Sequence, residues 1–549
     1  MFEVLERDLA ARIGRVETKS GVFETPVFVP VVNPVVQPIP PREMYEEFGC
    51  RILMTNAYII KKHFEDEAVE KGIHKLLDFP GVVATDSGAF QILQYGEVDV
   101  SAEEIALFQE DIGSDVAVIL DYPTGWGAPR SRALWTVEET YRRAEKTLKI
   151  LRRDDILWVG PVQGGDHLDL VEYSAKLMSK LPFPIHALGS PVQVMEQYRF
   201  DVLVDMVATA KSALPPDRPL HLFGAGHPFM FSLAVALGCD MFDSASYAIY
   251  ARDMRYMTTH GTMRVEDLEY LPCRCPVCSR LDAEELKEMP KEEAVGLVAR
   301  HNMYVCMAEV DRIRQAISEG RLWELLEARC RSHPSLTAAL RRLGRYAELL
   351  ERFSPSRKDR GFLYFGFEGL ARPEVVRHRR RILERFTPPG GRDVLLMLPQ
   401  VDERPFHRSR EFREAWNVVA KPLRSGGVNV HVCFYAYPFA VVPVELDETY
   451  PLSQFEAPHP PDWETVRYVA ETASEYVLRH RYRAVAVYGY EDWHSAVAEA
   501  VEEACRGAGV EFVCLLDERP WSIEGLSRLK SLIEDRVNTS VNTHETTSS

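Results

Sequence analysis

Eight short apolar runs alternate with helix-length amphipathic stretches between residue 27 and about residue 250. The runs are rich in Val, Ile and Leu and cover residues 27–33, 51–58, 82–89, 116–124, 156–165, 184–190, 220–228 and 239–248. Such alternation favours a parallel sheet, and eight β/α units in one register close into a barrel. We therefore predict an α/β protein built on a (β/α)₈ TIM barrel.

Nearly every one of these runs ends in a polar residue or a glycine. These ends are Asn33, Asn56, Asp86, Asp121, Gln163, Ser190, Gly224 and Asp243. Barrel enzymes carry their chemistry at the C-terminal ends of the strands. Any single residue of this kind has a simpler explanation, because Gly, Asp and Asn also punctuate loops. For the whole set we favour a functional site.

Two acidic residues, Asp86 in ATDSGAFQ and Asp243 in MFDSASYA, stand out by their context. Carboxylates on opposite sides of a barrel mouth can divide the work, with one attacking carbon and the other moving protons. Retaining glycosyl chemistry needs such a pair. The alternative is that Asp86 and Asp121 only cap the helices that follow their strands. Spacing does not separate these interpretations.

Other strand-end residues suit a flat heterocyclic ligand. Asp121, Gln163 and Gly189 offer hydrogen-bond donors and acceptors, while Phe90 and Phe223 can stack on the two faces of a ring.

Three cysteines crowd into CRCPVC, and a histidine follows on a helix-like stretch. Cys273, Cys275, Cys278 and His301 provide three thiolates and one imidazole, a closed tetrahedral set suited to one structural Zn²⁺. Cys306 is the nearest rival for the fourth position, but it lies five residues further on and so on a different helix face. We expect the metal to pin the segment after the last barrel strand to a following helix.

The overall composition limits the class of protein. The 549 residues include 65 Lys and Arg against 82 Asp and Glu, a net charge of −17, which argues against a general nucleic-acid coat. The apolar runs are too short to span a membrane, and the charged N-terminus lacks the apolar core of a secretory signal. Ten cysteines, with one metal-type cluster, indicate a reducing compartment. We expect a cytoplasmic multidomain enzyme.

The domain plan follows from these patterns. We expect a catalytic barrel at 1–353 with a zinc subdomain at about 270–305, then a linker and basic helix at 354–392. A C-terminal α/β extension at 393–525 has predicted strands at 393–400, 428–436 and 483–490 and predicted helices near 463–480 and 493–507. The polar tail, 526–549, is expected to be disordered.

The motifs together resemble the tRNA-guanine transglycosylase family in its archaeal form. They are DSGAFQ (86–91), LDYPT (120–124), VQGG (162–165), HLFGAGHP (221–228), FDSASYA (242–248), CRCPVC with the later HN (273–302), and VPVELDETYPLSQFE (442–456). The resemblance covers roughly residues 1–520. No Walker A motif is present, and GAGH (224–227) lacks the third glycine of a dinucleotide site.

The resemblance implies a zinc-containing barrel that replaces guanine 15 in the D-arm of tRNA with 7-cyano-7-deazaguanine (preQ0), an early step towards archaeosine. It implies that Asp243 is the nucleophile and Asp86 the general acid/base, although the DSG aspartate is also assigned as nucleophile in the family. Asp121 and Gln163 would read the edge of the base.

The remaining implied contacts with the base come from residues beside these. Gly189 and Ser190 would offer backbone groups, Phe90 and Phe223 would sandwich the ring, and Ser87 and Gly224 would line the same substrate site.

The resemblance also implies partners beyond guanine and preQ0. Archaeal members usually end in a small basic RNA-binding module, the PUA domain, and we see no room for it after residue 520. We therefore expect a separate chain to supply that module, or the other domains to hold tRNA alone. The resemblance further implies a homodimer formed around the zinc region. Alternative functions are a non-catalytic tRNA-binding paralogue, an archaeosine-forming amidotransferase-like relative, or a barrel enzyme for a small phosphorylated metabolite.

Two arginine groups are candidate phosphate contacts. Arg377, Arg379, Arg380 and Arg381 form the densest positive run, which a solvated helix face balanced by glutamates explains equally well. Arg130, Arg132, Arg142 and Arg143 follow the strand of Asp121, and pairing of the last two with Glu138 and Glu139 is the alternative.

Overall fold

The computed structural model describes residues 2–89, 100–390 and 393–545, with side chains up to residue 536. The chain divides into two compact units, Met1–Pro355 and Ser356–Ser549, and each is described by itself. Within the described residues, no helix combines the length and the apolar character needed to cross a membrane.

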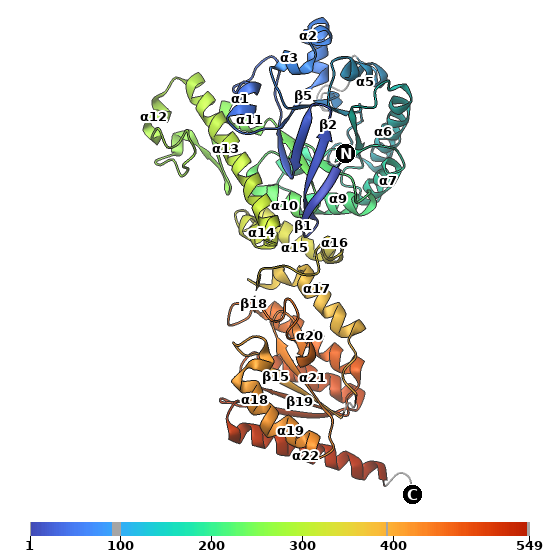
Figure 1. Cartoon of the computed structure of the whole chain (residues 1–549), viewed down its shortest axis with the longest axis vertical. Coiled ribbons are helices and arrows are strands. Elements are labelled where there is room, and N and C mark those ends of the chain that lie inside the picture. Colours follow the sequence, from blue (N-terminus) through green and yellow to red (C-terminus); the bar gives the residue numbers. More distant parts are fainter. Residues whose placement is uncertain (1, 90–99, 391–392, 546–549) are drawn as a thin grey trace. The chain divides into compact units, whose positions relative to one another are not determined.

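The first unit contains the predicted barrel (Figure 1). All eight predicted strands are present and pair in parallel, in the order β4-β11-β10-β9-β8-β7-β6-β5. A bridge between Val31 and Met54 brings the two end strands together. The strands are β4 (Val27–Pro30), β5 (Ile52–Asn56), β6 (Val82–Asp86), β7 (Val116–Val118), β8 (Leu157–Val162), β9 (Ile185–Leu188), β10 (Leu220–Leu222) and β11 (Met241–Ser244).

Helices between these strands cover the outside of the barrel. Helix α6 shows why they do so, because its apolar positions Ala133, Val137 and Ala144 repeat at helical spacing and are buried. The helices are α1 (Pro41–Glu46), α2 (Ala57–Lys71), α3 (Ile73–Leu77), α5 (Ala102–Asp111), α6 (Arg130–Ile150), α7 (Leu168–Met178), α8 (Val192–Glu196), α9 (Phe200–Ala213) and α10 (Phe231–Ala236), and α11 (Ser246–Arg252) follows the last strand.

A three-stranded antiparallel sheet closes the N-terminal end of the barrel. It consists of β1 (Phe2–Asp8), β2 (Ala11–Thr18) and β3 (Gly21–Thr25), and β3 leads directly into β4. Val16 and Phe23 of this sheet pack with the inward-facing residues of the barrel strands in one apolar cluster. The opposite end, where the strands terminate in polar residues, is therefore the end left for chemistry.

The segment after β11 forms an extension held by one long helix, α13 (Lys291–Ser318). The hairpin of β12 (Arg255–Thr258) and β13 (Gly261–Arg264) and the short α12 (Ala283–Glu288) precede it. Near its start, Asn302 receives a hydrogen bond from the backbone N–H of Met257. Near its end, the Arg314 guanidinium donates to the backbone carbonyls of Glu24 and Pro26. Three helices complete the unit: α14 (Leu322–Cys330), α15 (Pro334–Arg342) and α16 (Ala347–Phe353).

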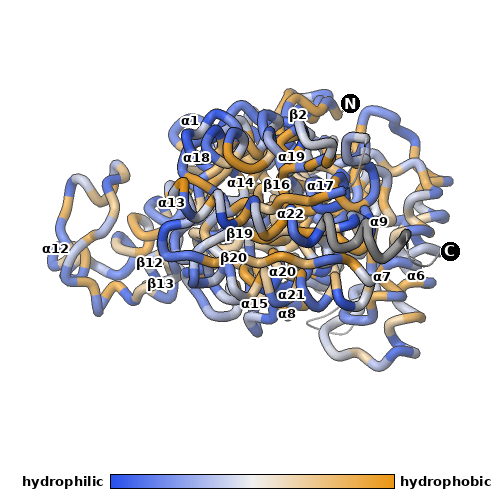
Figure 2. The backbone as a smooth tube through the Cα atoms, turned by 90° about the horizontal axis from the view of Figure 1, so that it is seen from below, coloured by the Kyte–Doolittle hydropathy of each residue, from blue (hydrophilic) through white to orange (hydrophobic). Residues whose placement is uncertain are grey.

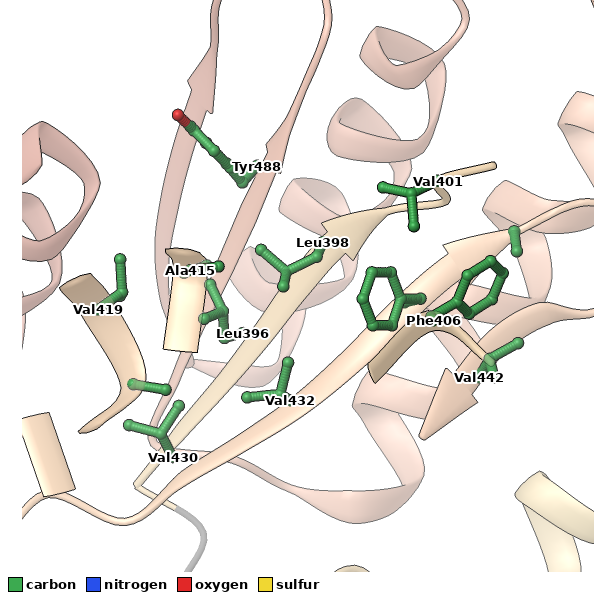
Figure 3. Close-up of a cluster of buried hydrophobic side chains, with 14 of the residues drawn as sticks. Leu396, Leu398, Val401, Phe406, Ala415, Val419, Val430, Val432, Val442 and Tyr488 are labelled. Atoms are coloured by element: carbon green, nitrogen blue, oxygen red, sulfur yellow. The ribbon is translucent and has the colours of Figure 1, made fainter. Parts of the chain in front are cut away.

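The second unit is built on a five-stranded sheet in the order β17-β16-β15-β19-β20. The predicted strands are β15 (Val394–Pro399), β16 (Val430–Ala436) and β19 (Ala484–Gly489), and β17 (Ala440–Pro443) and β20 (Glu511–Leu516) extend the sheet beyond the sequence prediction. One face, with Leu396, Val432 and Val442, packs on helical segments in Figure 3. The helices are α18 (Arg410–Ala415), the π-helical turn η7 (Trp416–Ala420), α19 (Lys421–Ser425), α20 (Trp463–His480), α21 (His494–Ala508) and α22 (Ile523–Glu545).

The expected disordered tail at 526–549 is wrong for most of its length. Residues 523–545 form α22, whose alternating blue and orange segments in Figure 2 reflect its mixed sequence. Leu526, Leu529 and Ile533 repeat on one face and are buried in the core of the second unit. These three apolar positions give the segment enough buried surface to fold as a helix, despite its polar composition.

The expected linker and basic helix at 354–392 also packs within the second unit. The short strand β14 (Phe362–Leu363) pairs with β18 (Phe455–Glu456), and α17 (Pro373–Arg380) carries the basic run. Phe362 and Val375 are buried in the same core cluster, so this segment belongs to the fold of the second unit and does not merely connect domains.

We predict that Leu529→Ala lowers the free energy of unfolding of the second unit by about 3 kcal/mol, because it leaves a cavity in a fully buried position. Leu532→Ala is the matched control, since Leu532 is 40% exposed on the same helix. Urea unfolding followed by circular dichroism measures both. Equal, small effects of the two changes would show that α22 does not pack as described.

Candidate active site and metal centre

The three acidic residues at the strand ends meet at the open end of the barrel. Asp86 is the last residue of β6, Asp121 follows β7, and Asp243 lies in β11. Asp121 is 3% and Asp243 9% exposed, so the carboxylates lie in a poorly solvated environment. Placing three ionisable acids close together in a poorly solvated environment disfavours their charged forms. The raised pKa values of two of them reflect this.

Asp86 is the most strongly perturbed of the three. Burial, together with the nearby charges of Asp121 and Asp243, raises its pKa to about 7. The backbone N–H groups of Ser87 and Gly88 act in the opposite direction, and the Asn56 side-chain amide donates to Oδ2 at 3.0 Å. Asp86 therefore exchanges its proton near neutral pH, as a general acid or base must.

Asp243 is held through one of its two carboxylate oxygens. The backbone N–H of Gly224 donates to Oδ1 at 3.3 Å, and His221 Nε2 lies 2.8 Å from the same oxygen without the alignment of a hydrogen bond. Among the described residues, no hydrogen bond or ion pair involves Oδ2. An oriented carboxylate with one uncommitted oxygen is suited to nucleophilic attack.

Asp121 and Gln163 form a hydrogen-bonded pair. Three donors converge on Gln163 Oε1, namely the N–H and hydroxyl of Thr124 at 3.0 and 3.2 Å and the hydroxyl of Ser190 at 2.9 Å. This fixes the amide so that Nε2 donates to Asp121 Oδ2. Burial raises the pKa of Asp121 to about 6, against the effect of this hydrogen bond. The pair presents adjacent donor and acceptor groups in a fixed geometry.

Two backbone positions beside this pair have special requirements. A Cβ atom at Gly189 would lie 2.2 Å from Gln163 Nε2, so only glycine lets the amide reach Asp121. Ser190 has a positive φ of 63°, unusual for a residue with a side chain, and its hydroxyl also accepts from the Thr124 N–H at 2.9 Å. The turn after β9 is thus shaped around the orientation of Gln163.

The other residues predicted to contact the base have different surroundings in the structure. Phe223 is half-buried next to the inner barrel cluster, with its ring 4.8 Å from that of His221. Ser87 is fully buried and its hydroxyl donates to the Ile119 carbonyl, so it supports the strand end that carries Asp86. Gly224 contributes its N–H to Asp243. Phe90 lies outside the described residues.

The four predicted metal ligands come together in the extension. Cys273, Cys275, Cys278 and His301 each offer one ligand atom, and these atoms lie within 4.8 Å of one another. The Sγ atoms of Cys275 and Cys278 are 3.6 and 3.3 Å from His301 Nδ1. Three sulfur ligands and one imidazole nitrogen fit a tetrahedral metal ion. The rival ligand Cys306 is fully buried and is not part of the group.

The surroundings of His301 prepare it for this role. Its Nε2 lies 2.8 Å from the Met257 carbonyl, which fixes the proton on Nε2 and leaves Nδ1 for the metal. The ring of Tyr256 stacks on the imidazole at 3.6 Å between centroids. Since the three cysteines lie in the 273–278 segment and His301 in α13, a bound metal ion would join these two parts of the extension, while Met257 of β12 contacts the helix through His301.

The candidate RNA-contacting arginines of the barrel are mostly paired within the protein. Arg142 and Arg143 both bind Glu139, which supports the simpler alternative for these two. Arg130 pairs with Asp169, and Arg132 lies over the Tyr122 and Trp135 rings. In the second unit, Arg379 pairs with Glu475. A role in binding phosphate stays a prediction for both groups.

His221 and Thr124 are the main site residues that the sequence reasoning passed over. Both stand inside the motifs, HLFGAGHP and LDYPT, but neither was chosen among the polar residues at the strand ends. Their roles depend on which side chains turn inward together, as His221 does toward Asp243. The sequence signal that could have identified His221 is a histidine within a strand-like run, two residues before an aromatic residue at the strand end.

Comparison with known proteins gives matches over both units. A family model described as queuine tRNA-ribosyltransferase matches residues 8–335, and a domain of unknown function matches residues 375–533. Three relatives are each named tRNA-guanine(15) transglycosylase. The protein from Methanosarcina mazei is 44% identical over 85% of this chain and 89% of its own length. The one from Aeropyrum pernix is 42% identical over 92% and 98%, and the one from Thermococcus kodakarensis 48% over 69% and 65%.

We predict that the purified chain carries one tetrahedral metal ion and that Cys278→Ser abolishes stoichiometric binding, because it removes one of three sulfur ligands. Elemental analysis by mass spectrometry measures the metal content. Cys514→Ser is the matched control, since Cys514 is exposed and outside the cluster. Full metal content in Cys278→Ser would refute the ligand set.

Proposed function

The chain belongs to the queuine tRNA-ribosyltransferase family, and we propose that it exchanges guanine 15 in the D-arm of archaeal tRNA for preQ0, in archaeosine biosynthesis. The observation that carries the proposal is the group of three coupled carboxylates at the barrel mouth, each at the end of a different β/α unit. The relatives named tRNA-guanine(15) transglycosylase support the choice of nucleic acid and base.

The contacts of Asp243 and Asp86 support different roles for them. We assign Asp243 as the nucleophile, whose Oδ2 attacks C1′ of the ribose while the Gly224 N–H binds Oδ1 and His221 Nε2 lies beside that oxygen. The C1′–N9 bond of guanine breaks, and a covalent ribosyl-enzyme forms. PreQ0 then attacks the same carbon and releases Asp243, so two inversions retain the configuration.

Asp86 is assigned as the general acid and base. With a pKa of about 7 it is protonated in part at neutral pH, so it can give a proton to the departing guanine. The resulting carboxylate can take the proton that preQ0 loses as its ring nitrogen bonds to C1′. The proton is thus returned at the end of each exchange, and no external reductant or nucleotide is consumed.

Recognition of the base is assigned to the Asp121–Gln163 pair. One oxygen of Asp121 accepts from Gln163 and the other is available to N–H groups on the edge of a purine-like ring. Phe223 borders the same strand ends and offers a face for stacking. Guanine within a folded tRNA arm is stacked, so it must be extruded to reach these groups.

The metal centre is proposed to bind Zn²⁺ through Cys273, Cys275, Cys278 and His301. A closed set of four protein ligands leaves no position for substrate, so the ion serves the fold of the extension. Dimerisation around this extension, and a separate chain supplying a PUA domain, stay predictions.

The direct test is incorporation of labelled preQ0 into unmodified archaeal tRNA, with release of guanine. We expect exchange by the wild type and no covalent tRNA adduct with Asp243→Asn on denaturing gels, whereas Asp86→Asn still forms some adduct but turns over slowly. Tight tRNA binding without exchange would favour the non-catalytic alternative. An adduct that survives in Asp243→Asn and disappears in Asp86→Asn would reverse the two roles.

The proposal also predicts the pH dependence of exchange. Because Asp86 must be protonated when guanine leaves, the rate of adduct formation should fall as the pH rises through about 7. Asp86→Asn cannot donate this proton, so its residual rate should lack that limb. Single-turnover measurements from pH 5 to pH 9 provide the profile, and Asp253→Asn, at an exposed position, is the control. An alkaline limb retained in Asp86→Asn would assign the limb to another group.

A further inference from the structure

The second unit contains a cavity of about 380 Å³ that the barrel chemistry does not use. Apolar and polar side chains line it: His407, Phe412, Trp416, Arg424, Val432, Val444, Glu445 and Glu448. Val432 is on the sheet face that packs on the helical segments in Figure 3. The volume lies within the range of small-molecule sites and is large enough for a nucleoside.

One wall of the cavity is aromatic and well ordered by its neighbours. Phe412 and Trp416 lie one helical turn apart, and their rings stack with centroids 5.8 Å apart. Trp416 begins the π-helical turn η7, a departure from α-helical geometry that is frequent at functional sites. The Arg424 guanidinium lies over the Trp416 ring at 4.6 Å. This wall can take a flat ring by stacking.

The polar side chains around the cavity use only some of their hydrogen-bonding atoms within the protein. Arg424 donates to the Val430 carbonyl through Nε and Nη2, which leaves Nη1. Glu445 accepts from His431 at Oε2, which leaves Oε1. Glu448 contacts Arg408 and His407 through Oε1, which leaves Oε2. Among the described residues, no other side chain forms a hydrogen bond or ion pair with these three atoms, while the backbone N–H of Glu445 also donates to its own carboxylate.

The charge state of this group favours one pattern of ligand. Burial alone would raise the pKa of Glu445, but the hydrogen bonds from His431 and from its own backbone N–H, with the nearby charges of His431 and Arg424, lower it below its usual range. Glu445 is therefore an acceptor-only carboxylate at neutral pH. A ligand that fits must offer N–H donors to carboxylate oxygen and an acceptor to the guanidinium, on a flat ring.

We propose that this cavity is a binding site for a guanine nucleoside or an unpaired guanine nucleotide, separate from the barrel site. Guanine presents adjacent N1–H and N2–H₂ donors, which match a carboxylate, and O6 and N7 acceptors, which match an arginine. Adenine and cytosine place a ring acceptor beside their amino group, which would face the carboxylate charge. Uracil has one ring N–H between two carbonyls. The cavity thus selects guanine by charge and by hydrogen-bond pattern.

The test uses the full chain with 6-thioguanosine as the photoreactive probe. After irradiation with long-wavelength ultraviolet light, peptide mapping by mass spectrometry locates the attachment. We expect labelled peptides from residues 407–424 or 444–448 in addition to any from the barrel. Unlabelled guanosine should compete at least tenfold better than adenosine, since a charged hydrogen bond is lost with adenosine. Unmodified tRNA as competitor distinguishes an RNA nucleotide from a free nucleoside as the source.

Two substitutions connect the labelling to the side chains. Glu445→Gln and Glu448→Gln should each reduce labelling of this cavity about tenfold and leave preQ0 exchange in the barrel unchanged. Glu503→Gln, at an exposed glutamate away from the cavity, should change neither. Labelling confined to the barrel, equal competition by adenosine, or full labelling in both cavity variants with intact thermal unfolding would each overturn the proposal. Loss of exchange with cavity labelling intact would instead count against the barrel assignment alone.

Discussion

Closure of the eight-stranded sheet is the constraint on which the site depends. The parallel pairing of β11 with β4 joins the last strand of the barrel to the first, and the bridge between Val31 and Met54 joins the first to the second. Because all eight strands run in one direction, their polar C-terminal residues gather at one end, while the sheet of β1, β2 and β3 covers the other. Asp86 and Asp243 are 157 positions apart in the printed sequence, yet closure makes them electrostatic neighbours. A local change in strand register would separate them.

The mouth of the barrel is an arrangement of acids whose neighbours determine what each can do. Asp121 accepts from Gln163, and Asp243 accepts from the Gly224 N–H beside His221, while burial and nearby charges raise the pKa of Asp86 to about 7. The same residue type therefore has three environments within one site, and this difference underlies our proposal that attack, proton transfer and recognition are divided among them. The second unit uses carboxylates in another way, as partly satisfied acceptors beside aromatic rings.

The sequence predicts those parts of the structure that depend on local pattern. Strand-like runs placed Asp86, Asp121, Gln163 and Asp243 at the barrel mouth, and the spacing of Cys273, Cys275 and Cys278 indicated a metal site, because both signals are short and chemically specific. His221 was missed as a site residue because its role depends on which way a strand residue turns. The helix over 523–545 was missed because three apolar residues in a polar segment matter only once a sheet face is there to receive them. Tertiary packing decides both cases.

Helix α13 extends from the metal centre to the first strand of the barrel. A helix of 28 residues extends about 42 Å at 1.5 Å per residue. One part of it supplies His301 to the cysteine cluster, and another grips the backbone at Glu24 and Pro26, where the N-terminal sheet passes into the first barrel strand. The helix therefore connects the metal site with the sheet that covers the N-terminal end of the barrel. A metal ion bound by the four ligands would therefore stabilise a helix that also contacts the start of the barrel.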